Sequence, residues 1–132
     1  MPHAFNRATF LAAKTSGQPL LSAYCQLVAT ELALKDHGST WQRGHDVPKM
    51  IDDFDDPGLT ALSAQLRLHL SGIPCTDTSG NTAPVSPSNY PTLRYAHHVS
   101  DRTGGTTDTH LQILVGIVED IIVKLRFKGV TI

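Results

Sequence analysis

The sequence predicts an all-α protein: an up-and-down bundle of about five helices, with a long loop rich in proline, serine and threonine before the last helix. Apolar residues recur at helical spacing along most of the chain, and glycine, proline and capping residues separate these periodic segments. Strand-like alternation is confined to the last three residues. A chain of 132 residues, 40% hydrophobic and 17% charged, is expected to form one domain over residues 1–132 with a single core.

The first two helices are expected at Ala4–Lys14 and Pro19–Asp36. One side of the first segment is apolar, and Gly17 marks its end. Proline suits the first turn of the second helix, because an amide hydrogen there has no partner within the helix. Gly38 follows the last periodic position, so the second helix is expected to stop there.

The third and fourth helices are predicted from the residues at their ends. Asp46 is the expected N-cap of the third helix, which should end soon after Phe54 because carboxylates crowd that end and oppose the helix dipole. The fourth helix is expected to begin at Asp56-Pro57 and to close at Gly72 and Pro74. Its apolar stripe consists of Leu59, Leu62, Leu66, Leu70 and Ile73.

The C-terminal third is expected to hold a loop and then the strongest helix. Residues 74–105 are predicted to form the loop, which is either functional or partly disordered, with a short helix at Leu93–Val99. Thr107 is the predicted cap of the last helix, whose apolar seam from Leu111 to Leu125 is wider than one face. Such a helix is either central or packs on a partner, so it is the expected surface of a homodimer.

The bulk composition excludes several classes of protein. A formal net charge of −1 gives no general attraction to nucleic acid or anionic membranes. The most apolar run, Leu111–Phe127, carries charged residues, which argues against a membrane span. The first residues lack a signal-peptide pattern, so a soluble cytoplasmic protein is expected. The isolated Cys25 and Cys75 form neither a disulfide framework nor a CxxC metal site.

No cofactor and no metal ion are expected. His97 and His98 are adjacent, so on a helix they point about 100° apart and do not readily share one metal ion. The chain has no HxxxH or HExxH spacing, no glycine-rich phosphate loop and no nucleophile elbow.

A charged pair lies within the apolar stripe of the second helix. Glu31 falls on the same face as Leu27, and Lys35 follows one turn later. Two interpretations remain open. The pair is a solvated helix edge, or Glu31 is partly buried and bonded to the His45-Asp46 loop or to Arg94. His45 and Asp46 are themselves expected to close that loop and to cap the next helix.

Three short segments resemble motifs of the HEPN family of small α-helical domains: Glu31–Lys35, Gly44–Met50 and Leu93–Tyr95, in that order. The resemblance covers the chain from about Pro19 to its end. It implies a helical bundle that commonly dimerises. Many members of the family are metal-independent endoribonucleases in toxin–antitoxin, phage-defence and CRISPR systems, and others are binding or assembly modules without catalysis.

Catalytic members of the family carry an arginine, four to six further residues and then a histidine, and this chain lacks that spacing. Two residues separate Arg94 from His97, and three separate it from His98. Seven residues separate Arg102 from His110. The resemblance therefore favours a non-catalytic module. It would act by dimerising through the last helix and by binding a protein encoded nearby, a nucleotide or RNA.

The alternative is a metal-independent endoribonuclease with a shifted motif. Arg94 would then stabilise the developing charge on phosphate, and His97 or His98 would move a proton as general acid and base. Together with Arg102, these side chains form the candidate anion or phosphate site. The two functions differ in whether the chain is an enzyme.

Overall fold

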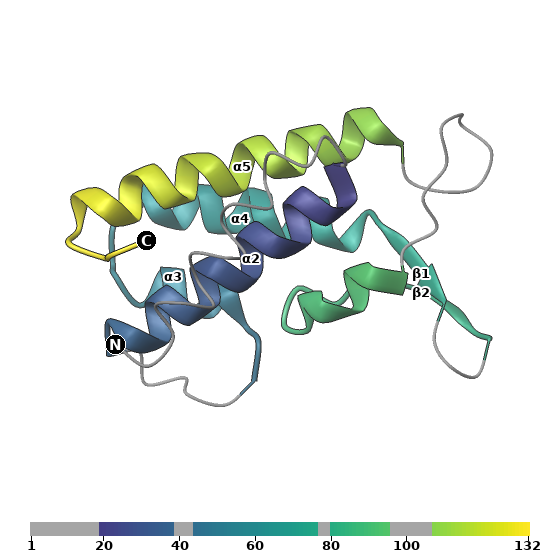
Figure 1. Cartoon of the computed structure of the whole chain (residues 1–132), viewed down its shortest axis with the longest axis horizontal. Helices are drawn as coiled ribbons and strands as arrows, with labels where there is room; N and C mark the ends of the chain where they lie inside the picture. Colours follow the sequence, from purple (N-terminus) through teal and green to yellow (C-terminus); the bar gives the residue numbers. More distant parts are fainter. Residues whose placement is uncertain (1–18, 39–43, 77–79, 96–106) are drawn as a thin grey trace.

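The protein is mostly helical, as a computed structural model describes it over residues 19–38, 44–76, 80–95 and 107–132 (Figure 1). The all-α class is confirmed at that level. The expected first helix, Ala4–Lys14, lies outside the described residues. The described elements are the helices α2 (Pro19–Asp36), α3 (Val47–Asp52), α4 (Pro57–Ser71) and α5 (Asp108–Phe127), the strands β1 (Pro74–Thr76) and β2 (Thr82–Pro84), and the 3₁₀ helix η2 (Tyr90–Tyr95).

Three long helices form the body of the molecule. Helix α5 packs against both α2 and α4, and α4 runs in the opposite direction to the other two (Figure 1). Their facing sides make the core, where burial of each leucine stabilises the fold by about 1.5–3 kcal/mol. Fully buried members of this core include Leu27, Leu34, Leu66, Leu70, Leu111, Leu114 and Leu125.

The predicted N-caps Asp46 and Thr107 are confirmed, and Asp56, where the fourth helix was expected to begin, is the N-cap of α4. Asp46, Asp56 and Thr107 precede α3, α4 and α5 respectively. Each of these side chains accepts a hydrogen bond from the backbone amide three residues further on, at 3.1, 3.0 and 3.3 Å. A cap of this kind contributes about 1 kcal/mol to helix stability. At the end of α2, Gly38 adopts a φ of 102°, a left-handed conformation that glycine reaches without strain.

Helix α3 ends at Asp52, whereas the sequence predicts an end soon after Phe54. Asp55 then takes a φ of 54°, which turns the chain toward α4. Side chains of α4 hold the short helix in place. Ser63 Oγ donates to the carbonyl of Pro48 at 3.0 Å, and Arg67 pairs with Asp52 at 2.6 Å.

The prediction of a loop over residues 74–105 is wrong where the structure has β1, β2 and η2. Strands β1 and β2 pair antiparallel with Cys75 opposite Ala83, and η2 follows. The short helix therefore begins at Tyr90 rather than at Leu93. Strands of three residues are too short to show alternation in a sequence. The side chains of Ile73 and Val85 are buried and hold the hairpin against the body, and the backbone N–H of Val85 donates a hydrogen bond to the carbonyl of Ile73 at 2.9 Å.

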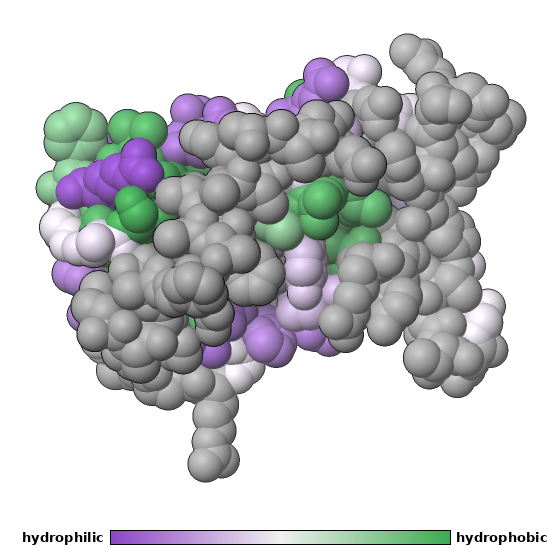
Figure 2. All heavy atoms as spheres, viewed as in Figure 1, coloured by the Kyte–Doolittle hydropathy of each residue, from purple (hydrophilic) through white to green (hydrophobic). Residues whose placement is uncertain are grey.

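Helix α5 presents a buried face and an exposed face. Within the described ranges, no helix combines the length and the apolar character that crossing a membrane requires. Green hydrophobic surface is nevertheless visible near the C-terminal end of α5 (Figure 2), where Val123 and Phe127 lie in solvent.

Candidate functional site

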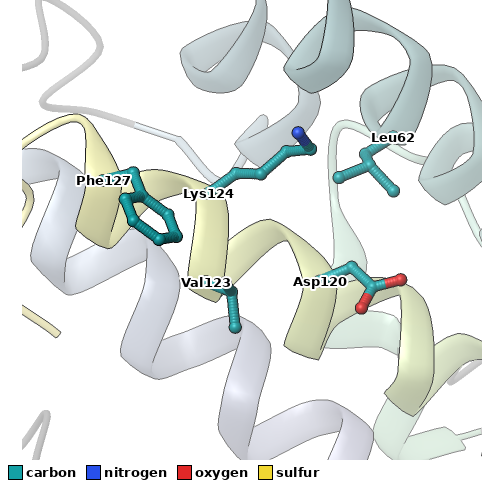
Figure 3. A pocket seen from close by; sticks show the side chains of 5 residues that line it. All are labelled: Leu62, Asp120, Val123, Lys124 and Phe127. Carbon is teal, nitrogen blue, oxygen red and sulfur yellow. The ribbon is translucent and has the colours of Figure 1, made fainter.

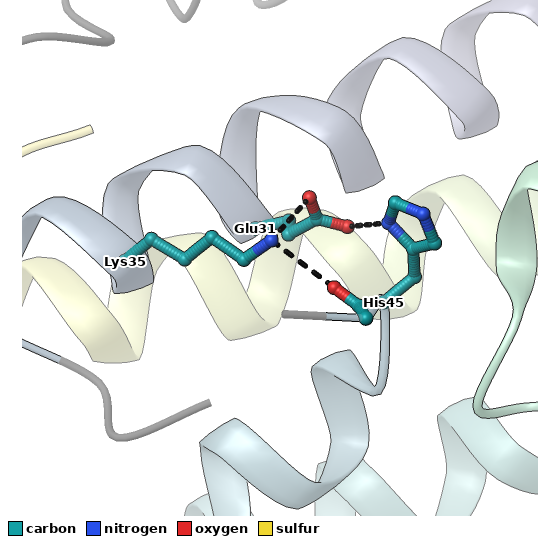
Figure 4. A network of polar contacts seen from close by, with 4 residues as sticks. Glu31, Lys35 and His45 are labelled. Atoms are coloured by element: carbon teal, nitrogen blue, oxygen red, sulfur yellow. Dashed lines mark hydrogen bonds and ion pairs between the residues drawn. The ribbon is translucent and has the colours of Figure 1, made fainter. Parts of the chain in front are cut away.

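The buried Glu31 is the centre of a polar network that joins three parts of the chain. Only 5% of this residue is exposed. Its carboxylate accepts a hydrogen bond from Lys35 Nζ at 3.2 Å and contacts His45 Nδ1 at 2.7 Å (Figure 4). A buried carboxylate costs several kcal/mol unless it is paired, and here it is paired on both oxygens. The structure therefore favours the buried network over a solvated helix edge.

Lys35 extends this network to the backbone of the following loop. Its ammonium group also donates to the carbonyl of Gly44 at 3.1 Å. Gly44 has a φ of 83°, a conformation in which a side chain would be strained. One ammonium group thus holds the loop before α3 against the last turns of α2. Lys35 therefore binds both the carboxylate of Glu31 and the carbonyl of Gly44. Glycine at position 44 allows the backbone conformation that this loop requires.

Tyr90, the first residue of η2, completes the network from the far side. It is 2% exposed, and its hydroxyl is hydrogen-bonded to Glu31. Burial raises the pKa of Tyr90, and the negative charge and hydrogen bond of Glu31 raise that pKa further, so the hydroxyl stays neutral and donates. Its ring also meets the rings of Tyr24 and His45, at centroid distances of 6.2 and 5.9 Å.

Arg94, the other expected partner of Glu31, has its backbone in η2, and its side chain is outside the described part of the structure. Tyr90, four positions earlier in the same segment, is a partner of Glu31 that the sequence analysis did not identify. A tyrosine directly before Pro91, the last proline of the Pro-rich segment, was the available signal.

His45 is the member of the network that faces solvent. Its side chain is 45% exposed, and its backbone forms an isolated parallel bridge with Asn89. Because Nδ1 contacts Glu31, the ring turns Nε2 away from the carboxylate (Figure 4). Asp46 stands apart from these contacts and caps α3. The network as a whole fastens α2, the loop before α3 and η2 together.

The remaining candidate residues are not part of this network. His97, His98 and Arg102 lie outside the described residues. His110 is on the first turn of α5, where its Nε2 is 3.0 Å from the carbonyl of His69. Among the residues whose side chains are described, no group of three or more histidine, cysteine, aspartate or glutamate residues is placed to hold a metal ion.

The two cysteines are unpaired and buried. Burial raises the pKa of the Cys25 thiol, which keeps it protonated and unreactive. Cys75 donates its thiol hydrogen to the carbonyl of Ala83 at 3.3 Å, across the hairpin. Neither thiol is therefore placed to act as a nucleophile.

A second feature lies on the outer surface of α5. A shallow pocket of about 300 Å³ opens between α4 and α5 (Figure 3). Phe127 and Val123 border it and are 87% and 49% exposed. Its lining residues are Leu62, Asp120, Val123, Lys124 and Phe127. Because these exposed apolar side chains are neighbours rather than scattered singly, the pocket is a candidate interaction surface.

Comparison with known proteins finds no relative for this chain: no protein-family model, curated protein or solved structure matches it. The fold and the two sites define a small, mostly helical domain. Inside this domain, the carboxylate of Glu31 is the centre of a polar network. On its surface, exposed apolar residues of α5 lie next to charged ones.

Proposed function

We propose that this protein is a catalytically silent HEPN-like helical module that acts by associating with itself and with a further partner. One observation carries the proposal. Segments that resemble the family lie side by side: Glu31 and Lys35 of α2 are bonded to Gly44 and His45, and Tyr90 comes from η2, which also contains Leu93–Tyr95. A resemblance based on short motifs gains support when the motifs build one structural unit.

The silent role follows from how the network uses its groups. Both carboxylate oxygens of Glu31 are engaged, and Lys35 is shared between that carboxylate and a backbone carbonyl. A fully satisfied polar network of this kind stabilises one geometry, which fits a structural role for these groups. The spacing from Arg94 to His97 and His98, shorter than in catalytic members, points the same way.

The proposed architecture is a five-helix up-and-down bundle. Helices α2, α4 and α5 alternate in direction along the chain, and α3 is a single short connection between them. In this proposal Ala4–Lys14 supplies the remaining helix. Backbone chemical shifts of residues 4–14 test this: helical values are expected, and random-coil values would reduce the bundle to the described helices.

The silent role is tested with RNA. A mixed RNA pool is incubated in EDTA with the wild-type protein and with Arg94→Ala, and the expected result is the same background in both. Cleavage by the wild type that disappears in Arg94→Ala would replace the proposal with a metal-independent endoribonuclease. In that case Arg94 would hold the phosphate, and His97 or His98 would move the proton.

The proposed partners are a second copy of the chain and either a protein encoded nearby or a nucleotide or RNA. A toxin–antitoxin or phage-defence setting fits such a module. Overexpression in bacterial cells gives a simple readout, because a silent module should leave growth unchanged. Growth arrest that depends on Arg94 would contradict silence.

A further inference from the structure

A line of outward-facing residues follows the full length of α5. We define the α5 stripe as Ile113, Gly116, Asp120, Val123, Lys124 and Phe127, which share one helix face because they recur every three or four residues. Ile113 is 48% exposed, Val123 is 49% exposed and Phe127 is 87% exposed. The pocket of Figure 3 lies at the C-terminal half of this stripe, next to α4.

Gly116 belongs to the stripe, and the described part of the chain gives no steric reason for a glycine at this position. A Cβ atom at this position would meet nothing within 4 Å. Glycine inside a helix costs about 0.5–1 kcal/mol relative to alanine. A bare backbone at this point leaves a notch in the stripe, into which a large side chain of another molecule can be seated.

The charges on the stripe indicate that the molecule bound there is a second copy of this chain. Asp120 and Lys124 lie one turn apart, and both are exposed. The Lys124 side chain lies at the edge of the stripe nearest α4, where a Cβ atom on Gly58 would be 2.9 Å from its Nζ. The midpoint between them and the midpoint between Gly116 and Phe127 fall at the same place along α5, near residue 122. One twofold axis at that place therefore brings both pairs into register between two antiparallel helices.

We infer that two copies of the protein pair through the α5 stripe, antiparallel about a twofold axis near residue 122. Asp120 of each copy faces Lys124 of the other, and Phe127 of each copy covers Gly116 of the other. A parallel arrangement places Asp120 against Asp120 and is repulsive. This inference rests on the proposed self-association and adds its surface and its register.

The experiment exchanges the two charges. Asp120→Lys gives a stripe with two lysines, and Lys124→Asp gives a stripe with two aspartates. Each variant alone is expected to dimerise about tenfold or more weakly than wild type, because like charges then face each other. An equimolar mixture is expected to form a heterodimer, and the double variant Asp120→Lys/Lys124→Asp is expected to regain the homodimer. Native mass spectrometry of the mixture, with one variant isotopically labelled, distinguishes these species.

A charge added outside the stripe provides the control. Leu68 is 69% exposed and belongs to α4, not to the α5 stripe. Leu68→Lys adds a positive charge there and should dimerise as wild type does. Circular dichroism checks that all variants fold, which is expected because the substituted side chains are exposed.

The outcomes separate the register from the association itself. If Asp120→Lys dimerises as well as wild type, or if the mixture gives no heterodimer, the proposed register is overturned while self-association stands. If the wild type itself is monomeric, the stripe does not bind a second copy, and the proposal of self-association fails with it.

Discussion

The network around Glu31 and the α5 stripe both combine charged and apolar residues, and they differ in where their partners are. In the network, the carboxylate of Glu31 is buried and its partners belong to the same chain. On the stripe, Val123 and Phe127 are exposed beside Asp120 and Lys124. The first arrangement stabilises the fold, and the second is suited to association. Substitutions in the two regions should therefore change different quantities.

The largest effect is expected from Glu31→Ala. Removing the carboxylate leaves Lys35, His45 and the Tyr90 hydroxyl without their common partner, and breaking such a buried network costs about 3 kcal/mol of folding free energy. Thermal melting followed by circular dichroism measures the loss. Glu119→Ala, an exposed glutamate on α5, should melt within a degree or two of wild type. An unchanged midpoint for Glu31→Ala would eliminate the network as a source of stability.

The next effect is expected from Phe127→Ala, and it should appear in association alone. The ring is 87% exposed in one chain, so its removal leaves the stability of that chain unchanged. The proposed dimer contains this aromatic contact twice, and loss of both contacts is expected to cost about 2 kcal/mol in total, a factor of about thirty in the dissociation constant. Sedimentation equilibrium measures this constant.

Leu68→Ala is the matched control for Phe127→Ala. Leu68 is 69% exposed and belongs to α4, outside the α5 stripe. Its removal should leave dimerisation as it is in wild type. If Leu68→Ala and Phe127→Ala weaken the dimer equally, the effect is a general one of surface hydrophobicity and the stripe has no special role.

A smaller loss of stability is expected from Tyr90→Phe. The substitution keeps the ring and removes the hydroxyl that bonds the buried carboxylate, which costs about 1.5 kcal/mol at neutral pH. The folded protein holds the pKa of Tyr90 above the value of about 10 in the unfolded chain. This contribution is therefore present in full below pH 10 and declines as the pH rises beyond it.

The pH dependence of this difference is a separate check. Urea unfolding of wild type and Tyr90→Phe at pH 7, 10 and 11 gives the free energies of unfolding. The gap between the two proteins should be constant up to about pH 10 and should narrow above it. A gap that widens with pH would contradict a neutral Tyr90 in the folded protein.

The smallest effect is expected from Gly116→Ala, and its two parts have opposite signs. The added methyl group meets open space, so the folded chain should gain about 0.5–1 kcal/mol from better helix propensity. The same methyl group fills the notch that is proposed to receive Phe127 of the second copy. Melting at low concentration and the dissociation constant are measured together. A dimer that strengthens or does not change would argue against close contact at Gly116.

The regular helices could be predicted from the sequence, whereas the contacts between distant segments could not. The seam of α5, the caps at Asp46 and Thr107 and the start of α4 at Asp56-Pro57 are local patterns, and the structure has them where they were expected. The β1–β2 hairpin escaped prediction because its strands have only three residues each. It lies in a segment whose prolines are typical of a loop.

The candidate site was predictable in part. The position of Glu31 on an apolar stripe indicated that it needs a neutralising partner, and Lys35 lies one turn away on the same helix. Its other partners are 14 and 59 residues away in sequence, His45 and Tyr90. Periodicity gives no information about such distances, because it describes one helix at a time.

The central claim is that the network around Glu31 stabilises the fold and that the α5 stripe binds a second copy of the chain. The mass of the wild-type protein in solution tests this claim most directly. Sedimentation velocity across a hundredfold range of concentration measures this mass. The mass is expected to rise from that of one chain to that of two chains and to stop there, as a closed twofold pair requires. A single-chain mass at every concentration would contradict the account, and so would a mass that keeps increasing beyond two chains.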